Sequence, residues 1–297
     1  MRFKLSGILP ALLTPFTRGG ANVDYEKACS FASTLADRGV DGVFVCGSTG
    51  EGLLMTLEER KQLAEEIIGA VGKRVRVVIQ TGCLDTAGTI ALTRHARDAG
   101  AVAVAVYAPS FYKYDDRALF AHFQLVAKAA PEMPLFLYNI PRFTGNALSP
   151  ALISELARKV DSVVGIKDSS GDLAYLSRVA ATAPKGFTTL NGADELGFQA
   201  YLSGAAGSVS MTANVVPELF ISIFNCVKDV NLKRALKDQR SLAEVKVALG
   251  NGQLIAAYKE AIRLQGYDVG HVRPPHRELS SSEKKDLAKV LVKVGLI

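Results

Sequence analysis

The chain has 297 residues, of which 48% are hydrophobic and 22% are charged, a balance that is typical of folded globular proteins. No uncharged apolar run approaches the roughly 18–20 residues that a membrane helix needs, so we expect no membrane span and no membrane partner. The net charge of +6 comes from Lys and Arg residues that are spread along the chain among acids. Without a basic run or an RNA-binding motif, the sequence does not indicate a nucleic-acid partner.

Cysteine and histidine residues form no disulfide or metal pattern. The cysteines lie far apart in the sequence, at Cys29, Cys46, Cys83 and Cys226, and so few in a long chain are typical of reduced cytoplasmic proteins. The four histidines form no H-x-x-x-H motif and no cluster with cysteine, so we expect no metal site. We interpret the apolar segment 1–16 as a buried strand and not as a signal peptide, because two prolines interrupt it.

Eight short apolar segments, rich in β-branched residues, alternate with longer segments of helical periodicity. The predicted strands are Gly7–Leu13, Gly42–Cys46, Arg76–Thr81, Ala101–Tyr107, Leu135–Asn139, Ser162–Lys167, Thr188–Asn191 and Gly207–Ser210. Residues suited to cap helices precede several of the helical segments, at Thr56, Asp85, Asp115 and Ser149.

This alternation predicts the fold class. A helix must return the chain between parallel strands, so eight such units in about 215 residues predict a closed (β/α)8 TIM barrel of the α/β class. A doubly wound open sheet is the structural alternative, but no G-x-G-x-x-G motif follows the first strand.

The strand pattern stops after about Asn214, and a C-terminal helical extension is predicted from there on. Its expected helices are Pro217–Val227, Leu232–Leu249, Gln253–Leu264 and Ser281–Val294. No Gly/Ser-rich linker precedes them, so this part should dock on the barrel. We therefore predict a catalytic barrel over residues 1–220 and a helical region packed on it over residues 221–297.

Two reactive side chains stand at predicted strand ends, where barrel enzymes carry their catalytic groups. Lys167 ends an apolar strand, and partial desolvation there should lower the pKa of its amine and favour the neutral, nucleophilic form. Tyr138 ends the preceding strand, one strand–helix–strand repeat earlier. A phenol beside such a lysine can relay protons. Each residue alone also suits a structural role, either as a lysine paired with Asp168 or as a core tyrosine.

A glycine-rich turn follows the second predicted strand, over residues 46–52. Its glycines let backbone N–H groups face a ligand, and Ser48 and Thr49 add hydroxyl groups. Such a turn can hold a carboxylate or a phosphate, although an ordinary βα turn has the same composition.

Three sequence motifs occur together in a characteristic order and spacing. They are Gly47-Ser48-Thr49-Gly50-Glu51, Tyr138-Asn139-Ile140-Pro141 and Gly165-Ile166-Lys167-Asp168. In this combination the chain resembles the dihydrodipicolinate synthase/N-acetylneuraminate lyase family of class I aldolases, from about Ile8 to beyond Asn214. Three further segments support the resemblance: Thr14-Pro15, Asn191-Gly192-Ala193-Asp194-Glu195 and Ser210-Met211-Thr212-Ala213-Asn214.

The resemblance implies a mechanism that uses no metal and no organic cofactor. Lys167 would form an imine with C2 of pyruvate or of a larger 2-oxo acid, and Tyr138 would be the acid and base. Ser48 and Thr49 would hold the carboxylate, with help from the backbone near Val209. The resemblance also implies a homo-oligomer, either a tetramer or a dimer.

Further residues are expected to contact the substrate, and some depart from the synthase pattern. Arg142, Thr144 and Ser169 are expected near the distal end of the substrate, and Gly192 is also expected to bind the substrate. In Tyr138-Asn139-Ile140-Pro141-Arg142-Phe143-Thr144, Phe143 stands where those synthases usually carry arginine. Phe111 stands where they supply a tyrosine from a neighbouring subunit.

An acidic pair, Asp194 and Glu195, resembles the sugar-acid lyases, in which such acids accept hydrogen bonds from substrate hydroxyls. The pair could equally complement a helix dipole. Met211 stands at the serine position of the sialate lyases, so sialic acid itself is not expected.

We therefore expect a lyase that cleaves a 2-keto-3-deoxy sugar acid reversibly to pyruvate and an aldehyde. The alternative is dihydrodipicolinate (4-hydroxy-tetrahydrodipicolinate) synthase, which condenses pyruvate with aspartate semialdehyde. A dehydratase acting through the same imine and a non-catalytic barrel that binds 2-oxo acids are further alternatives.

Overall fold

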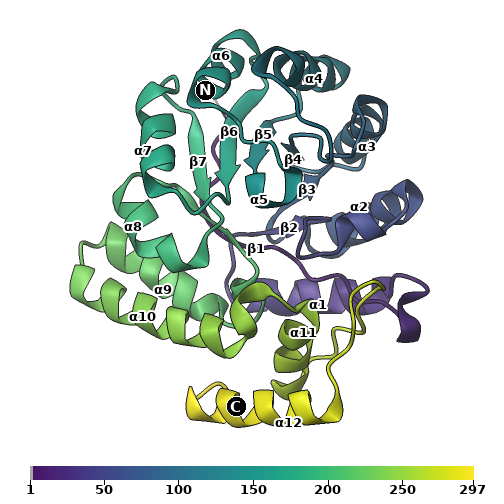
Figure 1. Ribbon diagram of the computed structural model, residues 1–297, viewed down its shortest axis with the longest axis vertical. Coiled ribbons are helices and arrows are strands. Elements are labelled where there is room, and N and C mark those ends of the chain that lie inside the picture. Colours follow the sequence, from purple (N-terminus) through teal and green to yellow (C-terminus); the bar gives the residue numbers. More distant parts are fainter. Residues whose placement is uncertain (1–2) are drawn as a thin grey trace.

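The computed structural model describes residues 3–297, and within them eight parallel strands form one sheet. The strands are β1 (Gly7–Pro10), β2 (Gly42–Val45), β3 (Arg76–Gln80), β4 (Ala103–Tyr107), β5 (Leu135–Asn139), β6 (Val163–Asp168), β7 (Thr188–Asn191) and β8 (Gly207–Ser210). Beyond β1, Ala11 forms a parallel bridge with Phe44 of β2, and the Leu12 N–H donates to the Phe44 carbonyl. These contacts join the two ends of the sheet, so the predicted (β/α)8 barrel is confirmed (Figure 1).

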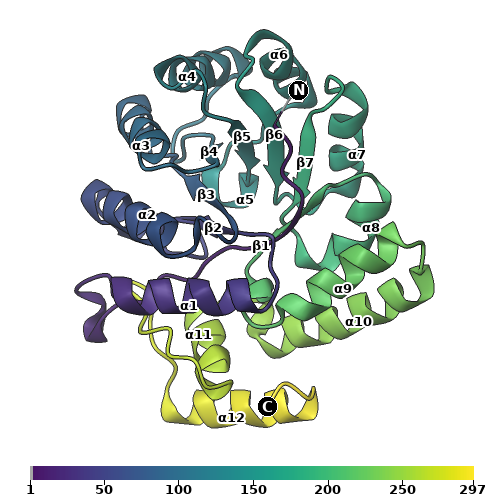
Figure 2. The same cartoon turned by 180° about the vertical axis from the view of Figure 1, so that it is seen from behind.

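Helices surround the strands on the outside, as Figures 1 and 2 show from opposite sides. They are α1 (Tyr25–Asp37), α2 (Leu57–Val71), α3 (Thr86–Asp98), α4 (Asp116–Ala129), α6 (Pro150–Lys159), α7 (Leu173–Thr182) and α8 (Gly197–Leu202). The expected caps are confirmed, because Thr56, Asp85, Asp115 and Ser149 each accept a hydrogen bond from a backbone N–H in the first turn. A short helix, α5 (Pro141–Thr144), directly follows β5 and was not expected.

The strands bury both faces, which explains their near-continuous apolar sequences. In β2, Val43 and Val45 pack with the surrounding helices, whereas Phe44 points into the barrel and packs with Tyr138 and Phe136. Side chains alternate between the two faces of a strand, so one strand supplies both layers of the core. The inner layer fills the barrel and supports the strand ends from below.

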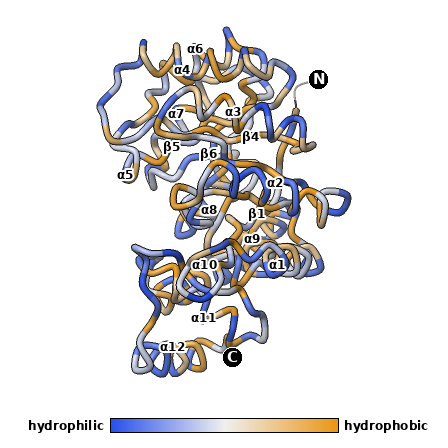
Figure 3. Tube along the Cα trace, turned by 90° about the vertical axis from the view of Figure 1, so that its right-hand side faces the viewer, coloured by the Kyte–Doolittle hydropathy of each residue, from blue (hydrophilic) through white to orange (hydrophobic). Residues whose placement is uncertain are grey.

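The C-terminal extension consists of α9 (Pro217–Lys228), α10 (Leu232–Ala248), α11 (Ile255–Leu264) and α12 (Ser281–Lys293). Each starts and ends within about two residues of the prediction. α9 runs across the boundary expected at residue 220, and that boundary remains a prediction. Figure 3 shows α12 far from the strands, with hydrophobic and hydrophilic residues alternating along it as in an amphipathic helix.

None of the helices that the structure describes in residues 3–297 is long and apolar enough to cross a membrane.

Candidate active site

A cavity of about 630 Å³ lies at the carboxyl ends of the strands, which is where barrel enzymes bind their substrates. Ten of the eleven residues expected at the site line it. They are Ser48, Thr49, Tyr138, Arg142, Thr144, Lys167, Ser169, Gly192, Asp194 and Val209. The volume lies within the usual range of ligand pockets and leaves room beyond a molecule as small as pyruvate.

Lys167 and Tyr138 are neighbours across β6 and β5. Their Cα atoms are paired in the sheet, so both side chains leave the strands on the same face and at the same end. The Lys167 Nζ lies 4.0 Å from the centre of the Tyr138 ring and 4.1 Å from that of Phe44. Only 4% of Lys167 and 3% of Tyr138 is exposed. The amine therefore lies between two aromatic rings and away from bulk water.

This environment shifts the pKa values of both groups. Burial lowers the pKa of Lys167, and the opposing effects of Tyr138 and Asp194 only partly compensate. Burial alone would raise the pKa of Tyr138, but the charge of Lys167 and hydrogen bonds from Ser48, Lys167 and Ser169 outweigh it and lower that pKa. A lysine that loses its proton more readily and a phenol that ionises more readily are suited to nucleophilic and acid–base work.

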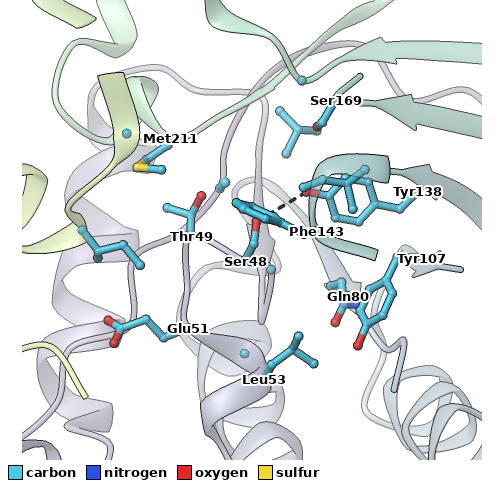
Figure 4. A pocket seen from close by; sticks show the side chains of 18 of the residues that line it. Ser48, Thr49, Glu51, Leu53, Gln80, Tyr107, Tyr138, Phe143, Ser169 and Met211 are labelled. Atoms are coloured by element: carbon cyan, nitrogen blue, oxygen red, sulfur yellow. Dashed lines mark hydrogen bonds between the residues drawn. The ribbon is translucent and has the colours of Figure 1, made fainter. Parts of the chain in front are cut away.

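The turn after β2 brings hydroxyl groups to this pair. The Ser48 Oγ lies 3.5 Å from the Tyr138 Oη (Figure 4), and Thr49 beside it is buried. The turn is tight, since a Cβ at Gly52 would stand 2.0 Å from the carbonyl oxygen of Cys46. Only glycine fits there. The tight turn therefore explains one of the glycines on which the prediction of a ligand-binding turn was based.

A buried ion pair connects this turn to the C-terminal extension. Glu51, which has a positive φ of 55°, accepts a hydrogen bond from the Lys259 Nζ at 2.8 Å, and both side chains are almost fully buried. Lys259 of α11 also donates to the carbonyls of Thr14 and His271, at 2.7 and 2.5 Å. The backbone N–H of Arg273 donates to the second oxygen of Glu51. The C-terminal extension therefore fixes the turn that carries Ser48 and Thr49.

Another part of the wall comes from the last strands of the barrel. Ser169 directly follows β6, Gly192 directly follows β7, and Val209 lies on β8. The Ser169 N–H donates to the Asn139 carbonyl, and the Gly192 N–H donates to the Asp168 carbonyl. A Cβ at Gly192 would stand 2.0 Å from the Ser169 Oγ. Glycine at that position therefore leaves space for the serine hydroxyl, which contributes to lowering the pKa of Tyr138.

The two acids predicted to act together are separated. Asp194 is buried at the cavity and accepts from the Thr212 N–H at 3.3 Å, and burial raises the pKa of its carboxyl group. Glu195 does not line the cavity and forms an ion pair with Lys246 of α10. Burial would raise the pKa of Glu195, but the hydrogen bond and charge of Lys246 lower it. The structure brings only Asp194 to the cavity, and a role of Glu195 in substrate binding stays a prediction.

Arg142 and Phe143 both lie on α5 and line the mouth of the cavity. The Arg142 guanidinium lies 4.6 Å from the centre of the Phe143 ring, a stacking distance for a cation and an aromatic ring. Phe111 is outside the cavity, 86% exposed, and has a φ of +79°.

Sequence reasoning missed several residues that line the cavity. Gln80 and Tyr107 do so from the ends of β3 and β4, and the rule that pointed to Lys167 and Tyr138 could have found them. Lys246 and Tyr258 line it from the C-terminal extension. No local pattern signalled those two, because the docking of the extension depends on contacts distant in sequence. Within residues 3–297, no three or more His, Cys, Asp or Glu residues are grouped to hold a metal ion.

A buried lysine beside a tyrosine at the carboxyl ends of barrel strands defines a class of lyase, the class I aldolases, which work through a lysine Schiff base. Residues 4–294 match the Dihydrodipicolinate synthetase family. The chain belongs to this family.

Relatives match over the whole chain. A 4-hydroxy-tetrahydrodipicolinate synthase from Methanopyrus kandleri is 34% identical over 297 residues, which are 100% of this chain and 99% of the relative. An uncharacterized DapA-like lyase from Halobacterium salinarum is 35% identical over 293 residues, 99% of this chain and 95% of the relative.

Solved structures of two proteins are similar to this chain over nearly its whole length. YagE, a prophage protein of the dihydrodipicolinic acid synthase family from E. coli K12, was solved in complex with pyruvate. It has a TM-score of 0.94 and 32% identity, with 99% of this chain and 100% of that one covered. A catalytic-lysine mutant of the sialic acid aldolase from Ruminococcus gnavus has a TM-score of 0.94 and 26% identity, with 99% and 97% covered.

Proposed function

We propose that the protein condenses pyruvate with an aldehyde, or cleaves the product of such a condensation, through an imine on Lys167. The observation that carries this proposal is the position of the Lys167 Nζ, buried in the cavity and 4.0 Å from the centre of the Tyr138 ring. Burial lowers the pKa of this amine, which increases the neutral fraction able to attack a carbonyl carbon.

The reaction follows from the groups present. The neutral amine of Lys167 adds to C2 of pyruvate, and Tyr138 moves protons so that the carbonyl oxygen leaves as water. The protonated imine then draws electrons from C3, which loses a proton and becomes an enamine carbon. That carbon attacks the aldehyde carbonyl, and hydrolysis of the imine releases the product and restores Lys167. The reverse sequence cleaves the C3–C4 bond of a larger 2-oxo acid.

The turn after β2 supplies the second anchor for pyruvate. Ser48 and Thr49 would donate hydrogen bonds to its carboxylate, and the backbone at Val209 would complete the contact. Because the Ser48 Oγ is 3.5 Å from the Tyr138 Oη, this anchor would place C2 within reach of both reacting side chains. These steps need no metal and no organic cofactor, and we expect dialysis against a chelator to leave the activity unchanged.

For the aldehyde, two candidates remain. Relatives named 4-hydroxy-tetrahydrodipicolinate synthase favour aspartate semialdehyde, the substrate of the alternative predicted from the sequence. Arg142 at the cavity mouth supports this candidate, since a guanidinium can bind the carboxylate of that aldehyde. We therefore place the synthase first.

The second candidate is a lyase that acts on 2-keto-3-deoxy sugar acids. Phe111 and Phe143 favour it, because they replace the tyrosine and the arginine of the synthase pattern, and Asp194 lines the cavity. Glu195 lies outside the cavity and no longer supports it.

The imine is tested by borohydride trapping with pyruvate, followed by intact mass and peptide mapping. The expected result is one stable pyruvate-derived adduct on Lys167 and none in Lys167→Ala. A folded wild-type protein without an adduct would remove the proposal. Initial rates with pyruvate and aspartate semialdehyde, compared with cleavage of sugar acids, then separate the two candidates. A cytoplasmic location also remains a prediction.

A further inference from the structure

One wall of the cavity comes from the C-terminal extension. Lys246 of α10 and Tyr258 of α11 line it, together with Gly252 between the two helices. A Cβ at Gly252 would stand 3.5 Å from the Met211 side chain, and Figure 4 shows Met211 across the cavity from Tyr138. The proposed mechanism takes no group from this wall.

Lys246 places a positive charge in this wall. Its side chain is 20% exposed, and its Nζ pairs with Glu195, which lies outside the cavity. Burial raises the pKa of Asp194, and the charge of Lys246 is among the effects that oppose this rise, so the amine acts on a carboxyl group that lines the cavity. An ammonium group has three N–H donors. The pair with Glu195 therefore leaves donors of Lys246 for a ligand.

Arg142 is a second cation at the cavity mouth. Its guanidinium stacks on Phe143 and forms no ion pair with an acid among the described residues. Burial would raise the pKa of Glu195, but Lys246 and the charge of Arg142 lower it. Both cations therefore act on the same acid, Glu195, and together they exceed it by one charge.

The acids in the cavity wall do not remove this excess. Glu51 is paired with the buried Lys259. Asp194 is buried and accepts a hydrogen bond from the Thr212 N–H at 3.3 Å. Both carboxyl groups are thus engaged by protein donors. A positively charged mouth raises the local concentration of anions, so a substrate with a negative group is favoured there.

We propose that Lys246 and Arg142 bind an anionic group at the far end of the second substrate, and that Glu195 competes with this anion for Lys246. This inference rests on the proposed function, because Lys167 and the turn after β2 would hold pyruvate. The cavity of about 630 Å³ leaves room beyond pyruvate. An aldehyde that enters through the mouth and reacts at the enamine carbon keeps its tail toward the mouth. The anion can be a carboxylate or a phosphate, since both suit an ammonium and a guanidinium.

The test compares kcat/KM for two matched pairs of aldehydes, with pyruvate as the common partner. Succinic semialdehyde and butanal differ by a carboxylate, and glyceraldehyde 3-phosphate and glyceraldehyde differ by a phosphate. The measured quantity is the ratio of the anionic to the neutral aldehyde in each pair, because a ratio on one protein does not depend on how much of it is folded. Wild type should prefer the anionic member of at least one pair, and that pair identifies the anion.

Variants of the cations and of Glu195 should change this ratio in opposite directions. Lys246→Met and Arg142→Met should each lower it about tenfold, as expected for a lost hydrogen bond to a charged group, and Lys246→Arg should keep most of it. Glu195→Gln should raise it about two- to fivefold, because it frees the Lys246 amine from an exposed ion pair. A purely structural role of that pair would give Lys246→Met and Glu195→Gln the same direction of change, or none.

The matched control is Lys289→Met on α12, which removes the lysine of another exposed ion pair, with Asp286 at 2.9 Å. It lies outside the cavity and should leave both ratios unchanged. Wild-type ratios in Lys246→Met and Glu195→Gln would overturn the anion subsite, and so would a wild type that prefers both neutral aldehydes or turns over neither anionic one. The proposed function fails separately, because borohydride trapping with pyruvate requires no aldehyde.

Discussion

At the scale of single residues, the proposed reaction depends on how Lys167 and Tyr138 change each other's pKa. The charge and hydrogen bond of Tyr138 raise the pKa of Lys167, while burial lowers it by more. Lys167 therefore keeps a pKa below that of an ordinary lysine, and imine formation should increase as the pH rises through this lowered value. In the proposed mechanism the phenol supplies protons, and it also holds the pKa of Lys167 above what burial alone would give.

Tyr138→Phe should therefore have two effects on the rate. The maximal rate should fall by about 100-fold or more, because proton transfer by a positioned group contributes about 10²–10⁴. The pH at which the rate is half-maximal should move downward, because Lys167 loses the group that raised its pKa. The measurement is a pH profile of borohydride-trapped adduct against time. An upward shift of the midpoint would contradict this account of the pair.

Some of the residues of the candidate site could be predicted from the sequence, and others could not. Lys167, Tyr138, Ser48 and Thr49 were predicted because each ends a strand or follows one, and because the motifs that contain them together resemble one family. Local patterns locate strand ends, but position alone left a structural role open for each residue. Glu195 was also close to a strand end, yet its side chain turns to Lys246. The sequence could not predict this, because the partner lies on α10, about 50 residues further along the chain.

At the scale of elements, the buried pair of Glu51 and Lys259 connects the turn after β2 to α11. Lys259→Met should lower the free energy of unfolding by about 3–5 kcal/mol, because it leaves the Glu51 carboxylate buried without its partner. The matched control is Lys159→Met on α6, whose pair with Glu155 is exposed, with an expected change of about 0.5 kcal/mol or less. Denaturant unfolding of the three proteins measures both changes, and equal losses would contradict the role of the buried pair.

The elements themselves were predicted well, for a physical reason. Strands buried on both faces have continuous apolar sequences, and the helices around them have one apolar side, so both types are readable locally. The short helix α5 was missed because four residues are too few to show periodicity. The path of the extension could not be predicted, since its docking depends on contacts such as that of Lys259 with Thr14.

At the scale of the whole molecule, Phe111 and Tyr112 form an exposed aromatic pair with ring centres 5.0 Å apart. Phe111 also adopts a φ of +79°, which is strained for a large side chain. Exposed aromatic groups held in a strained loop are typical of contact surfaces. The pair therefore supports the expected homo-oligomer, which remains a prediction.

Light scattering coupled to gel filtration should give a mass of two or four times 31.7 kDa. Phe111→Asp should shift the distribution toward smaller species, because it places a charge in the contact. Val292→Asp on α12, which replaces another exposed apolar residue, should leave the mass unchanged. A monomeric wild type at micromolar concentration would count against the oligomer.

The contact between Glu51 and Lys259 also has a consequence for synthesis on the ribosome. The two residues are 208 positions apart, which corresponds to about 10–40 s of translation at roughly 5–20 residues per second. During that interval the emerging chain already contains Ser48, Thr49, Tyr138 and eventually Lys167, but the turn after β2 has no counterion for its buried acid. The turn that we propose to bind the 2-oxo acid therefore gains its buried counterion only after α11 has left the exit tunnel.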